Sequence, residues 1–437
     1  MICRSILLAI LLTPFASYAC PDLKGYLQAS SGVDPDWPLI GQELEPYFEQ
    51  CLTSSLYFSL RGAAQLNTGR LPEAIESLER ALLLDPDNGA ALVDYAQALL
   101  EDGQLFAAIE ANRLALARDD APDDLLSQIA RRERDWSALT RQTSYQIDLV
   151  GGFDDNLNGG PDEDLIALTL AGEPILLTLS QSLRAASGPF ANLRGVVRHR
   201  QLAPERQHNF LGQLRGRLSE DAASDVLQVN ASYSQAFGAG TRGRQVGAGV
   251  NHLAFGGNSL FTGVDTRVRW QTATAGACRP YIAGALQYQT WHGQELLNGL
   301  ESKLSLGGDC ALAGSPNQRL GLESSLLYNA GLAANRLGGD RAGWQIRVQW
   351  QVAVAGGLIA TQLGHTTLED RRGYSQLLAD NARRRIARNS VLVQYRRRLS
   401  VSGADLLINF YHQDQGSSLS LFRTEDTSLE MGLSWRF

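Results

Sequence analysis

The sequence predicts an α + β multidomain protein, in which an N-terminal α-helical solenoid precedes a C-terminal antiparallel transmembrane β-barrel of about 14 strands. Two observations predict this division. Residues before 141 repeat at the spacing of paired helices, whereas later residues alternate between apolar and polar. A third concerns the membrane: after residue 20 no apolar run approaches the ~20 residues of a transmembrane helix, so a spanning chain has to cross with strands.

Length, charge and motifs narrow the classes of function. The chain has 437 residues, enough for two or three domains, and its net charge of −7 argues against nucleic acid as a partner. The sequence has no Gly-x-Ser-x-Gly elbow, no His-Glu-x-x-His helix and no phosphate-binding loop, and its histidines are scattered. We therefore expect neither an enzyme nor a cofactor.

The N-terminus predicts export. Arg4 precedes an apolar run over residues 6–12 and a stretch of small residues, which is typical of a signal peptide over residues 1–19. Cys20 follows the predicted cleavage point. Lipidation of this cysteine is an alternative, although Ser17 stands where a lipoprotein signal usually has Leu.

Residues 20–140 are predicted to form the helical domain, because two segments match at an offset of 34 residues. The matched positions are Phe58, Gly62, Gly69, Ala74, Ala81 and Pro86, against Leu92, Ala96, Gly103, Ala108, Ala115 and Asp120. These residues resemble the tetratricopeptide pattern, in which small residues let paired helices cross closely. Residues 22–54 and 123–140 are expected to be flanking helices that cap the stack.

Arrays of this kind bind polypeptide in a concave groove, to which the first helix of each repeat contributes. The candidate client groove consists of Leu56, Ser59, Ala63, Asn67, Val93, Gln97 and Leu100. Simple packing, as a scaffold or a plug, is the other interpretation.

Residues 141–437 are predicted to form the barrel, from about fourteen alternating segments of roughly 10–14 residues each. Their centres lie near residues 148, 196, 212, 229, 248, 265, 284, 304, 324, 347, 361, 394, 408 and 432. Links from even to odd strands are short, whereas the long links 154–187, 331–340, 368–387 and 413–426 have the other parity. If the first strand enters from the periplasm, the short turns lie there too.

The last strand alternates up to Trp435 and Phe437, which resembles the C-terminal recognition strand of outer-membrane barrels. We expect these two residues to be the signal for the barrel assembly machinery. The protein is accordingly expected in the bacterial outer membrane, in contact with its lipid, with the helical domain in the periplasm.

Four cysteines remain after the signal peptide, and an even number in an oxidising compartment predicts disulfides. Cys278 and Cys310 fall at the same end of adjacent predicted strands, so we expect them to pair. The remaining pair is Cys20–Cys51.

The polar face of the predicted strands is rich in arginine. The candidate lumen charges are Arg194, Arg198, Arg215, Arg217, Arg267, Arg269, Arg347, Arg396 and Arg398. Acidic residues share this face, so a paired network that stiffens a narrow barrel is the favoured interpretation. The alternative is an electropositive passage for an acidic polymer or a polypeptide.

A motif ends the first strand: Phe153, Asp154, Asp155, Asn156 and Asn158. It resembles the aromatic–Asp–x–Asn–x–Asn signature of the Slam family, the surface lipoprotein assembly modulators, and residues 165–175 are similar to the loop that follows it there. The chain departs from the family in having Phe153 where Tyr is usual, and fewer clear repeats. Asp154, Asp155, Asp162 and Asp164 allow a calcium site, but a solvated acidic loop is the favoured interpretation.

The resemblance implies a periplasmic tetratricopeptide domain, a fourteen-stranded barrel and a role in protein export. The implied client is a surface lipoprotein or a related secreted binding protein, and periplasmic chaperones are further candidate partners. A tetratricopeptide-containing exopolysaccharide export porin and a general porin with an accessory helical domain are the alternatives.

Overall fold

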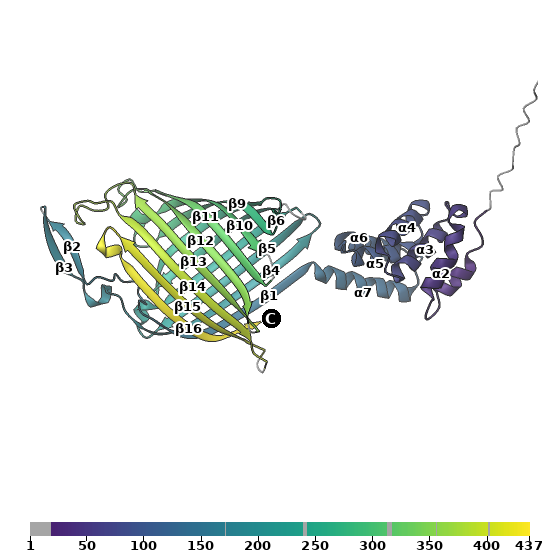
Figure 1. Cartoon of the computed structure of the whole chain (residues 1–437), viewed down its shortest axis with the longest axis horizontal. Helices are drawn as coiled ribbons and strands as arrows, with labels where there is room; N and C mark the ends of the chain where they lie inside the picture. Colours follow the sequence, from purple (N-terminus) through teal and green to yellow (C-terminus); the bar gives the residue numbers. More distant parts are fainter. Residues whose placement is uncertain (1–18, 171, 239–242, 313–316, 355, 401–402) are drawn as a thin grey trace, which may run out of the picture. The chain divides into compact units, whose positions relative to one another are not determined.

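The computed structural model describes residues 19–170, 172–238, 243–312, 317–354, 356–400 and 403–437 (Figure 1). All but the last residue of the predicted signal peptide lies outside the described residues. The chain divides between Thr140 and Arg141 into a helical unit and a barrel unit.

The helical unit is built from seven α-helices and one 3-10 helix within its described residues. These are α1 (Lys24–Ser30), α2 (Trp37–Leu44), η1 (Glu45–Gln50), α3 (Ser55–Asn67), α4 (Leu71–Leu84), α5 (Gly89–Glu101), α6 (Leu105–Leu116) and α7 (Asp123–Leu139). No helix in the described part of the chain is long and apolar enough to span a membrane.

The predicted repeat is visible in the helix boundaries. Helices α5 and α6 begin 34 residues after α3 and α4, and the caps repeat at the same interval. The side chains of Ser54 and Asn88 accept hydrogen bonds from the first turns of α3 and α5. Gly69 and Gly103 follow α3 and α5 with φ of +76° and +83°, which a glycine adopts without strain.

Small residues at the crossings let the helices of each pair pack closely. Ala74, Ala81 and Ala108 are completely buried. At Gly62 a Cβ would lie 2.5 Å from Leu78 Cγ, so only glycine fits this crossing of α3 and α4. The leading helices are fastened by the Cys20–Cys51 disulfide, which confirms the first predicted pair.

In the barrel unit, fourteen antiparallel strands of the described chain form a closed barrel, as predicted (Figure 1). They are β1 (Arg141–Asp154), β4 (Gly188–Ala203), β5 (Arg206–Ser219), β6 (Val226–Phe237), β7 (Gly243–Phe255), β8 (Asn258–Gln271), β9 (Cys278–Trp291), β10 (Gly299–Ala311), β11 (Gln318–Gly331), β12 (Arg341–Val354), β13 (Gly357–Asp370), β14 (Arg385–Arg398), β15 (Asp405–Ser417) and β16 (Thr424–Arg436). Each strand pairs with its neighbour in sequence, and β1 pairs with β16 to close the ring.

The two ends of the barrel have different connections. At the end where β1 begins, which we call the turn end, every link between strands is six residues or shorter. At the other end, the loop end, lie the longest links: 155–187, 332–340 and 371–384. The disulfide Cys278–Cys310 joins β9 to β10 at the turn end and confirms the second predicted pair.

Alternation along the strands separates two faces of the wall. Leu149 and Met431 point outward and are 54% and 62% exposed, whereas Asp148 and Glu430 beside them are 2% and 8% exposed inside the barrel. The outer face is therefore apolar and the inner face polar, which is the pattern of a barrel that sits in lipid.

The first loop carries a hairpin of its own, β2 (Leu165–Leu170) and β3 (Glu173–Thr178). It is attached to other loops by a small apolar cluster of Ile166, Leu378 and Leu419. Three links of the loop end, 155–187, 371–384 and 418–423, are thereby packed together.

Candidate functional site

The lumen of the barrel is lined by charged and amide side chains. Strand pairing places the candidate arginines on the face that holds Asp148 and Glu430. Asp148, for example, lies opposite Arg194, which in turn lies opposite Arg215. All nine candidates have this inward register: Arg194, Arg198, Arg215, Arg217, Arg267, Arg269, Arg347, Arg396 and Arg398.

Most of these arginines are held in ion pairs between or along strands. The pairs, with their N–O distances, are Arg194–Asp148 (3.8 Å), Arg215–Glu430 (3.7 Å), Arg217–Asp154 (3.1 Å), Arg267–Asp265 (2.7 Å), Arg269–Asp309 (3.0 Å), Arg347–Glu323 (3.7 Å) and Arg398–Asp405 (3.5 Å). Three of the pairs join neighbouring strands, three bridge strands that lie further apart in the ring, and Arg267–Asp265 lies within β8. Paired in this way, the arginines cross-link the wall and stiffen it.

The pairing leaves a surplus of positive charge. Arg198 and Arg396 have no acidic partner among the described residues, and the Nε atom of Arg396 is buried without a hydrogen bond. Arg388, which the sequence interpretation missed, donates to the neutral amide of Gln415 and has no acidic partner in the described part of the barrel. An inward face that combines ion pairs with unpaired arginine side chains suits anionic or polar molecules better than apolar ones.

The asparagines of the motif at the end of β1 form hydrogen bonds to distant parts of the chain. Asn156 Nδ2 donates to the carbonyls of Gly160 at 2.9 Å and Glu425 at 2.7 Å. Asn158 Nδ2 donates to the Arg184 carbonyl at 2.7 Å. Short amide side chains are needed here because each bonds both within its turn and to a second segment.

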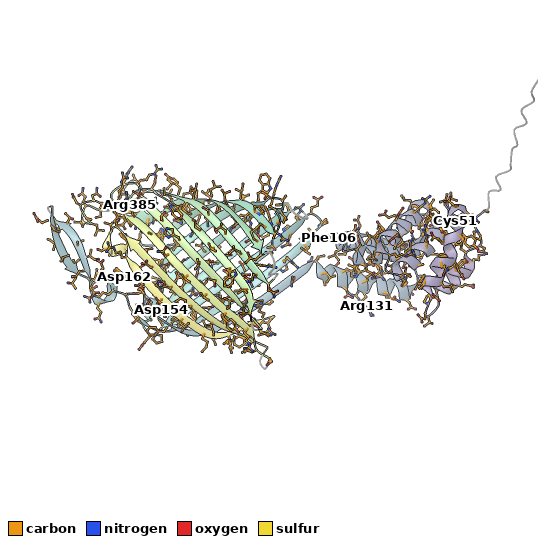
Figure 2. The ribbon with its side chains drawn as sticks, in the orientation of Figure 1. Cys51, Phe106, Arg131, Asp154, Asp162 and Arg385 are labelled. Carbon is orange, nitrogen blue, oxygen red and sulfur yellow. A yellow bond between two sulfur atoms is a disulfide. The ribbon has the colours of Figure 1, made fainter. Side chains whose placement is uncertain are left out.

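The aspartates of the motif complete a clasp across the seam that closes the barrel. Asp155 Oδ1 accepts from the amide of Thr427 on β16 at 2.6 Å. Asp154 is 4% exposed and pairs with Arg217 of β5. Phe153 points outward instead and is 54% exposed. The motif thus joins β1, β5 and β16 at the loop end, a role that its sequence alone does not reveal. Asp154 and Asp162 are labelled on the barrel unit in Figure 2.

The acidic residues near this clasp do not form the calcium site considered from the sequence. Asp154 and Asp155 approach Asp426, with carboxylate oxygens within 4.8 Å of one another. Asp162 and Asp164 are engaged elsewhere, by a backbone amide and an arginine.

The candidate client groove of the helical unit is partly closed. Ser59 and Ala63 are each 6% exposed because α3 contacts α1, α2, α4 and α5, so the prediction that they line an open surface is wrong. Val93 and Leu100 pack against the apolar cluster around Ile129 of α7. The last helix therefore covers one side of the groove.

The part of the groove that remains open is largely polar. Leu56 and Gln97 are half-buried and Asn67 is exposed. Asp94 is also half-buried on α5, and burial raises its carboxyl pKa to about 6, although the positive charge of Arg132 acts in the opposite direction. This strip is suited to hydrogen bonds with an extended peptide.

The hairpin β2–β3 exposes an unusual amount of apolar surface. All six residues of β3 are exposed, and Ile175, Leu176 and Leu177 are among them. The sequence signal was present, because two short apolar runs flank Gly172, which has a φ of +88°. Because these runs lack alternation, the sequence predicts only a loop here, and the structure adds the hairpin.

Comparison with protein families gives a tetratricopeptide repeat match over residues 66–131. This match covers α4 to α6 and most of the repeat predicted above. A comparison with curated protein sequences finds no match.

Solved structures similar to the barrel are bacterial outer-membrane proteins. The outer membrane channel DcaP of Acinetobacter baumannii is 8% identical, covers 69% of this chain and 99% of its own, and has a TM-score of 0.37. OprB of Pseudomonas putida is also 8% identical, covers 70% and 97%, and has the same TM-score of 0.37. The helical unit is similar to the TPR2B domain of yeast Sti1, at 22% identity over 26% of this chain and 90% of that one, with a TM-score of 0.23.

These likenesses are too distant to carry a functional argument, and the class of the barrel follows from its own geometry. It is closed, its fourteen described strands are antiparallel, and its outer face is apolar. The barrel is of the outer-membrane type.

Proposed function

We propose that this protein promotes the translocation of a client polypeptide across the outer membrane. The helical unit receives the client in the periplasm, and the barrel helps it to the cell surface or the medium. The resemblance of residues 153–158 to the Slam motif supports a surface lipoprotein or a related secreted binding protein as the client. The proposal involves no catalytic step and no cofactor.

The observation that carries this proposal is the union of two modules in one chain. A tetratricopeptide unit with an open polar strip is followed directly by a barrel, and only Thr140 lies between α7 and β1. A client held by the helical unit is therefore tethered to the barrel by a very short connection. Effective concentration rises when two binding elements are linked so closely.

The orientation is part of the proposal. In outer-membrane barrels short turns face the periplasm and long loops face outward. The turn end of this barrel has links of at most six residues, and β1 begins there. On this basis the turn end and the helical unit belong to the periplasm, where the barrel assembly machinery and chaperones would meet the newly exported chain.

Export of a polysaccharide is less well supported. The family match covers residues 66–131, so the groove has room for about two repeats, and a glycan fibre would need a longer array. The interpretation as a general porin gives the helical unit no function.

The test compares two forms of the protein at matched outer-membrane levels: the full chain and a barrel that lacks residues 20–140. Protease accessibility of candidate surface lipoproteins on intact cells is the readout. We expect the truncated form to assemble, as shown by a heat-modifiable band, and client exposure to fall. Equal exposure with both forms would remove the delivery role, and unchanged solute permeability without any client effect would point to a porin.

A further inference from the structure

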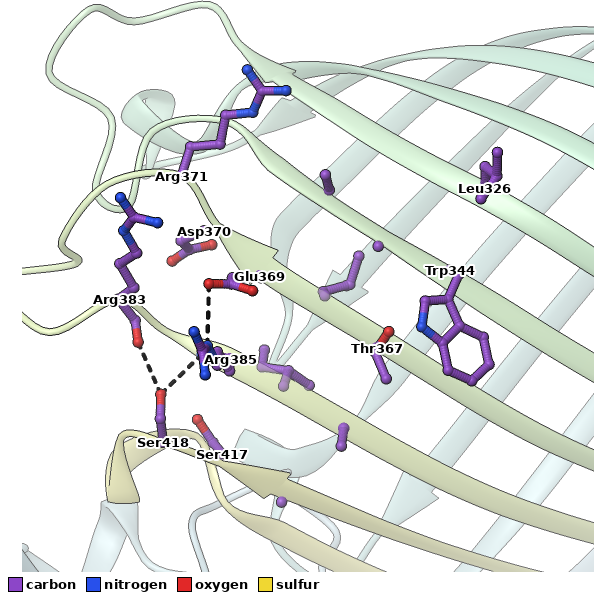
Figure 3. Close-up of a pocket in the computed structure, with 16 residues that line it drawn as sticks. Leu326, Trp344, Thr367, Glu369, Asp370, Arg371, Arg383, Arg385, Ser417 and Ser418 are labelled. Carbon is purple, nitrogen blue, oxygen red and sulfur yellow. Dashed lines mark hydrogen bonds and ion pairs between the residues drawn. The ribbon is translucent and has the colours of Figure 1, made fainter.

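An open groove on the outside of the barrel has the volume of a small-ligand site. It has a volume of about 860 Å³, within the range of about 300–1,000 Å³ typical of such sites, and crosses β11 to β15 near the loop end (Figure 3). Trp344 is paired with Leu326 and Thr367, so the three side chains share one face of the wall. Leu326 and Trp344 are exposed, which makes this the outward face. Ala387 and Gly416 are small outward residues, and the missing side-chain bulk creates the hollow.

The two ends of the groove differ in chemistry. Leu326 and Trp344, which are 63% and 41% exposed, form the apolar end. Arg371, Arg383 and Arg385 gather at the other end, beside the loops (Figure 3). A ligand that fits this groove therefore has an apolar part directed toward the membrane and an anionic part near its surface.

Two of the three arginines form no ion pair with a described carboxylate, although the Arg371 guanidinium lies over the Tyr328 ring, 5.3 Å from its centroid. Arg385 pairs with Glu369 at 3.1 Å. Arg371 and Arg383 have no ion-pair partner among the described residues, and both are exposed. The three arginines outnumber the nearby carboxylates of Glu369 and Asp340, so the basic end keeps a net positive charge.

The arginines are presented by an anchored backbone. Arg384, between Arg383 and Arg385, turns inward, where it pairs with the buried Asp370 at 3.1 Å and lies over the rings of Tyr374 and Phe422. Because neighbouring side chains in an extended segment point to opposite sides, fixing Arg384 inward directs its two neighbours outward. Ser418, the residue after β15, also donates from its Oγ to the Arg383 carbonyl at 3.0 Å and so holds the same segment (Figure 3).

We infer that this groove binds one molecule of lipid A, the phosphorylated glycolipid of the outer leaflet. Its acyl chains lie along Leu326 and Trp344, and its phosphates pair with Arg371 and Arg383. The inference rests on the orientation proposed above, which places the loop end in the outer leaflet.

Charge and position favour this occupant over the alternatives. Guanidinium groups match phosphate oxygens bidentately, and two unpaired guanidiniums suit a lipid with two phosphates better than a phospholipid with one. A client peptide is less suitable, because the groove opens on the apolar wall where lipid, and not water, surrounds the barrel.

The test uses the full-length protein in detergent, with diphosphoryl lipid A as the probe and native mass spectrometry as the readout. We expect one bound lipid A, with an affinity at least tenfold above that for phosphatidylglycerol. Arg371→Gln/Arg383→Gln should weaken binding about tenfold or more, because two charge-assisted contacts are lost. Arg397→Gln is the matched control, since Arg397 faces outward at the turn end of the same strand as Arg385.

A second variant tests the apolar part without touching charge. A Cβ at Gly416 meets only the Ala387 carbonyl oxygen at 3.9 Å, so Gly416→Leu fits the strand but fills the groove. Gly284→Leu is its control, because an added Cβ on the outward face of β9 meets nothing within 4 Å. Heat-modifiability confirms that each variant is assembled.

Full lipid A binding by both groove variants, equal losses in the two controls, or equal affinity for phosphatidylglycerol would overturn the inference. No client is present in this assay. Loss of lipid binding with normal client exposure on cells would therefore contradict the groove alone, and the reverse result would contradict the proposed function alone.

Discussion

The helical unit and the barrel use the same apolar residues in opposite ways. In the helical unit Leu78 and Ala81 are completely buried, whereas in the barrel Leu149 and Leu326 are 54% and 63% exposed. Apolar surface at a period of 3.6 residues is removed from water by packing helices together. Apolar surface at a period of two is removed from water by lipid, so the apolar side chains of the barrel wall contact lipid and do not pack into a core.

What holds each unit follows from this difference. The barrel depends on unbroken strand pairing and on inward charges that satisfy one another, such as Arg217–Asp154. The helical unit depends on close crossings of small residues, such as Gly62 against Leu78. Substitutions in the barrel should therefore act through backbone pairing, and substitutions in the helical unit through packing.

The largest effect is expected from Gly432→Val on β16. A Cβ at this position would collide with the carbonyl of Leu149 and lie 2.6 Å from Val150 Cα, where β1 and β16 close the barrel. We expect loss of nearly all heat-modifiable barrel in outer-membrane fractions. Gly195→Val is the control, because Gly195 pairs with β1 on its other side and has nothing within 4 Å. Similar losses in both variants would show that the closing seam is no more constrained than other pairs.

The two disulfides offer a comparison at nearly equal loop length, since they span 31 and 32 residues. Removing Cys20–Cys51 with two alanines should destabilise the helical unit by about 3–4 kcal/mol, a fall of roughly 10–20 °C in its melting temperature. Removing Cys278–Cys310 should leave the heat-modifiable fraction unchanged, because β9 and β10 are also held by their other neighbours. Thermal melting followed by the helical circular-dichroism signal, with semi-native gels for the barrel, separates the two outcomes. A barrel that fails to assemble without Cys278–Cys310 would break the contrast.

The sequence was most informative where a residue's role depends on its immediate neighbours. Alternation located all fourteen strands, and the 34-residue offset located α3 to α6, because side-chain period and helix pairing are local properties. The motif at residues 153–158 was found, but its clasp to Glu425 and Thr427 was not, since hydrogen bonds across some 270 residues leave no local trace. Ser59 and Ala63 were misplaced for the same reason: how many helices surround α3 depends on packing.

A smaller effect is expected at a helix crossing. Gly62→Ala puts a Cβ 2.5 Å from Leu78 Cγ, and overpacking of this kind costs about 1–3 kcal/mol. Gly25→Ala is the matched control, because Gly25 in α1 has nothing within 4 Å, and alanine there should stabilise the helix by about 0.5–1 kcal/mol. Opposite shifts in the helical melting temperature are the expected result. Neither variant should alter barrel assembly, and a barrel defect in Gly62→Ala would contradict the independence of the two units.

The smallest effect concerns the charge of Asp94, a carboxylate of the helical unit that is half-buried and forms no ion pair among the described residues. Burial raises the Asp94 pKa to about 6 in the folded state, above the value of about 4 expected when unfolded. Between these values the folded state binds more protons, so this group adds stability as pH falls from 6 to 4 and lowers stability at pH 7. Asp94→Asn should raise the helical melting temperature at pH 7 and reduce its gain on acidification. Asp119→Asn, which changes an exposed carboxylate of the same unit, should do neither. If wild type and Asp94→Asn gained equally between pH 7 and pH 5, burial of Asp94 would not be the cause. The helical unit would then bury the Asp94 carboxylate without a measurable loss of stability.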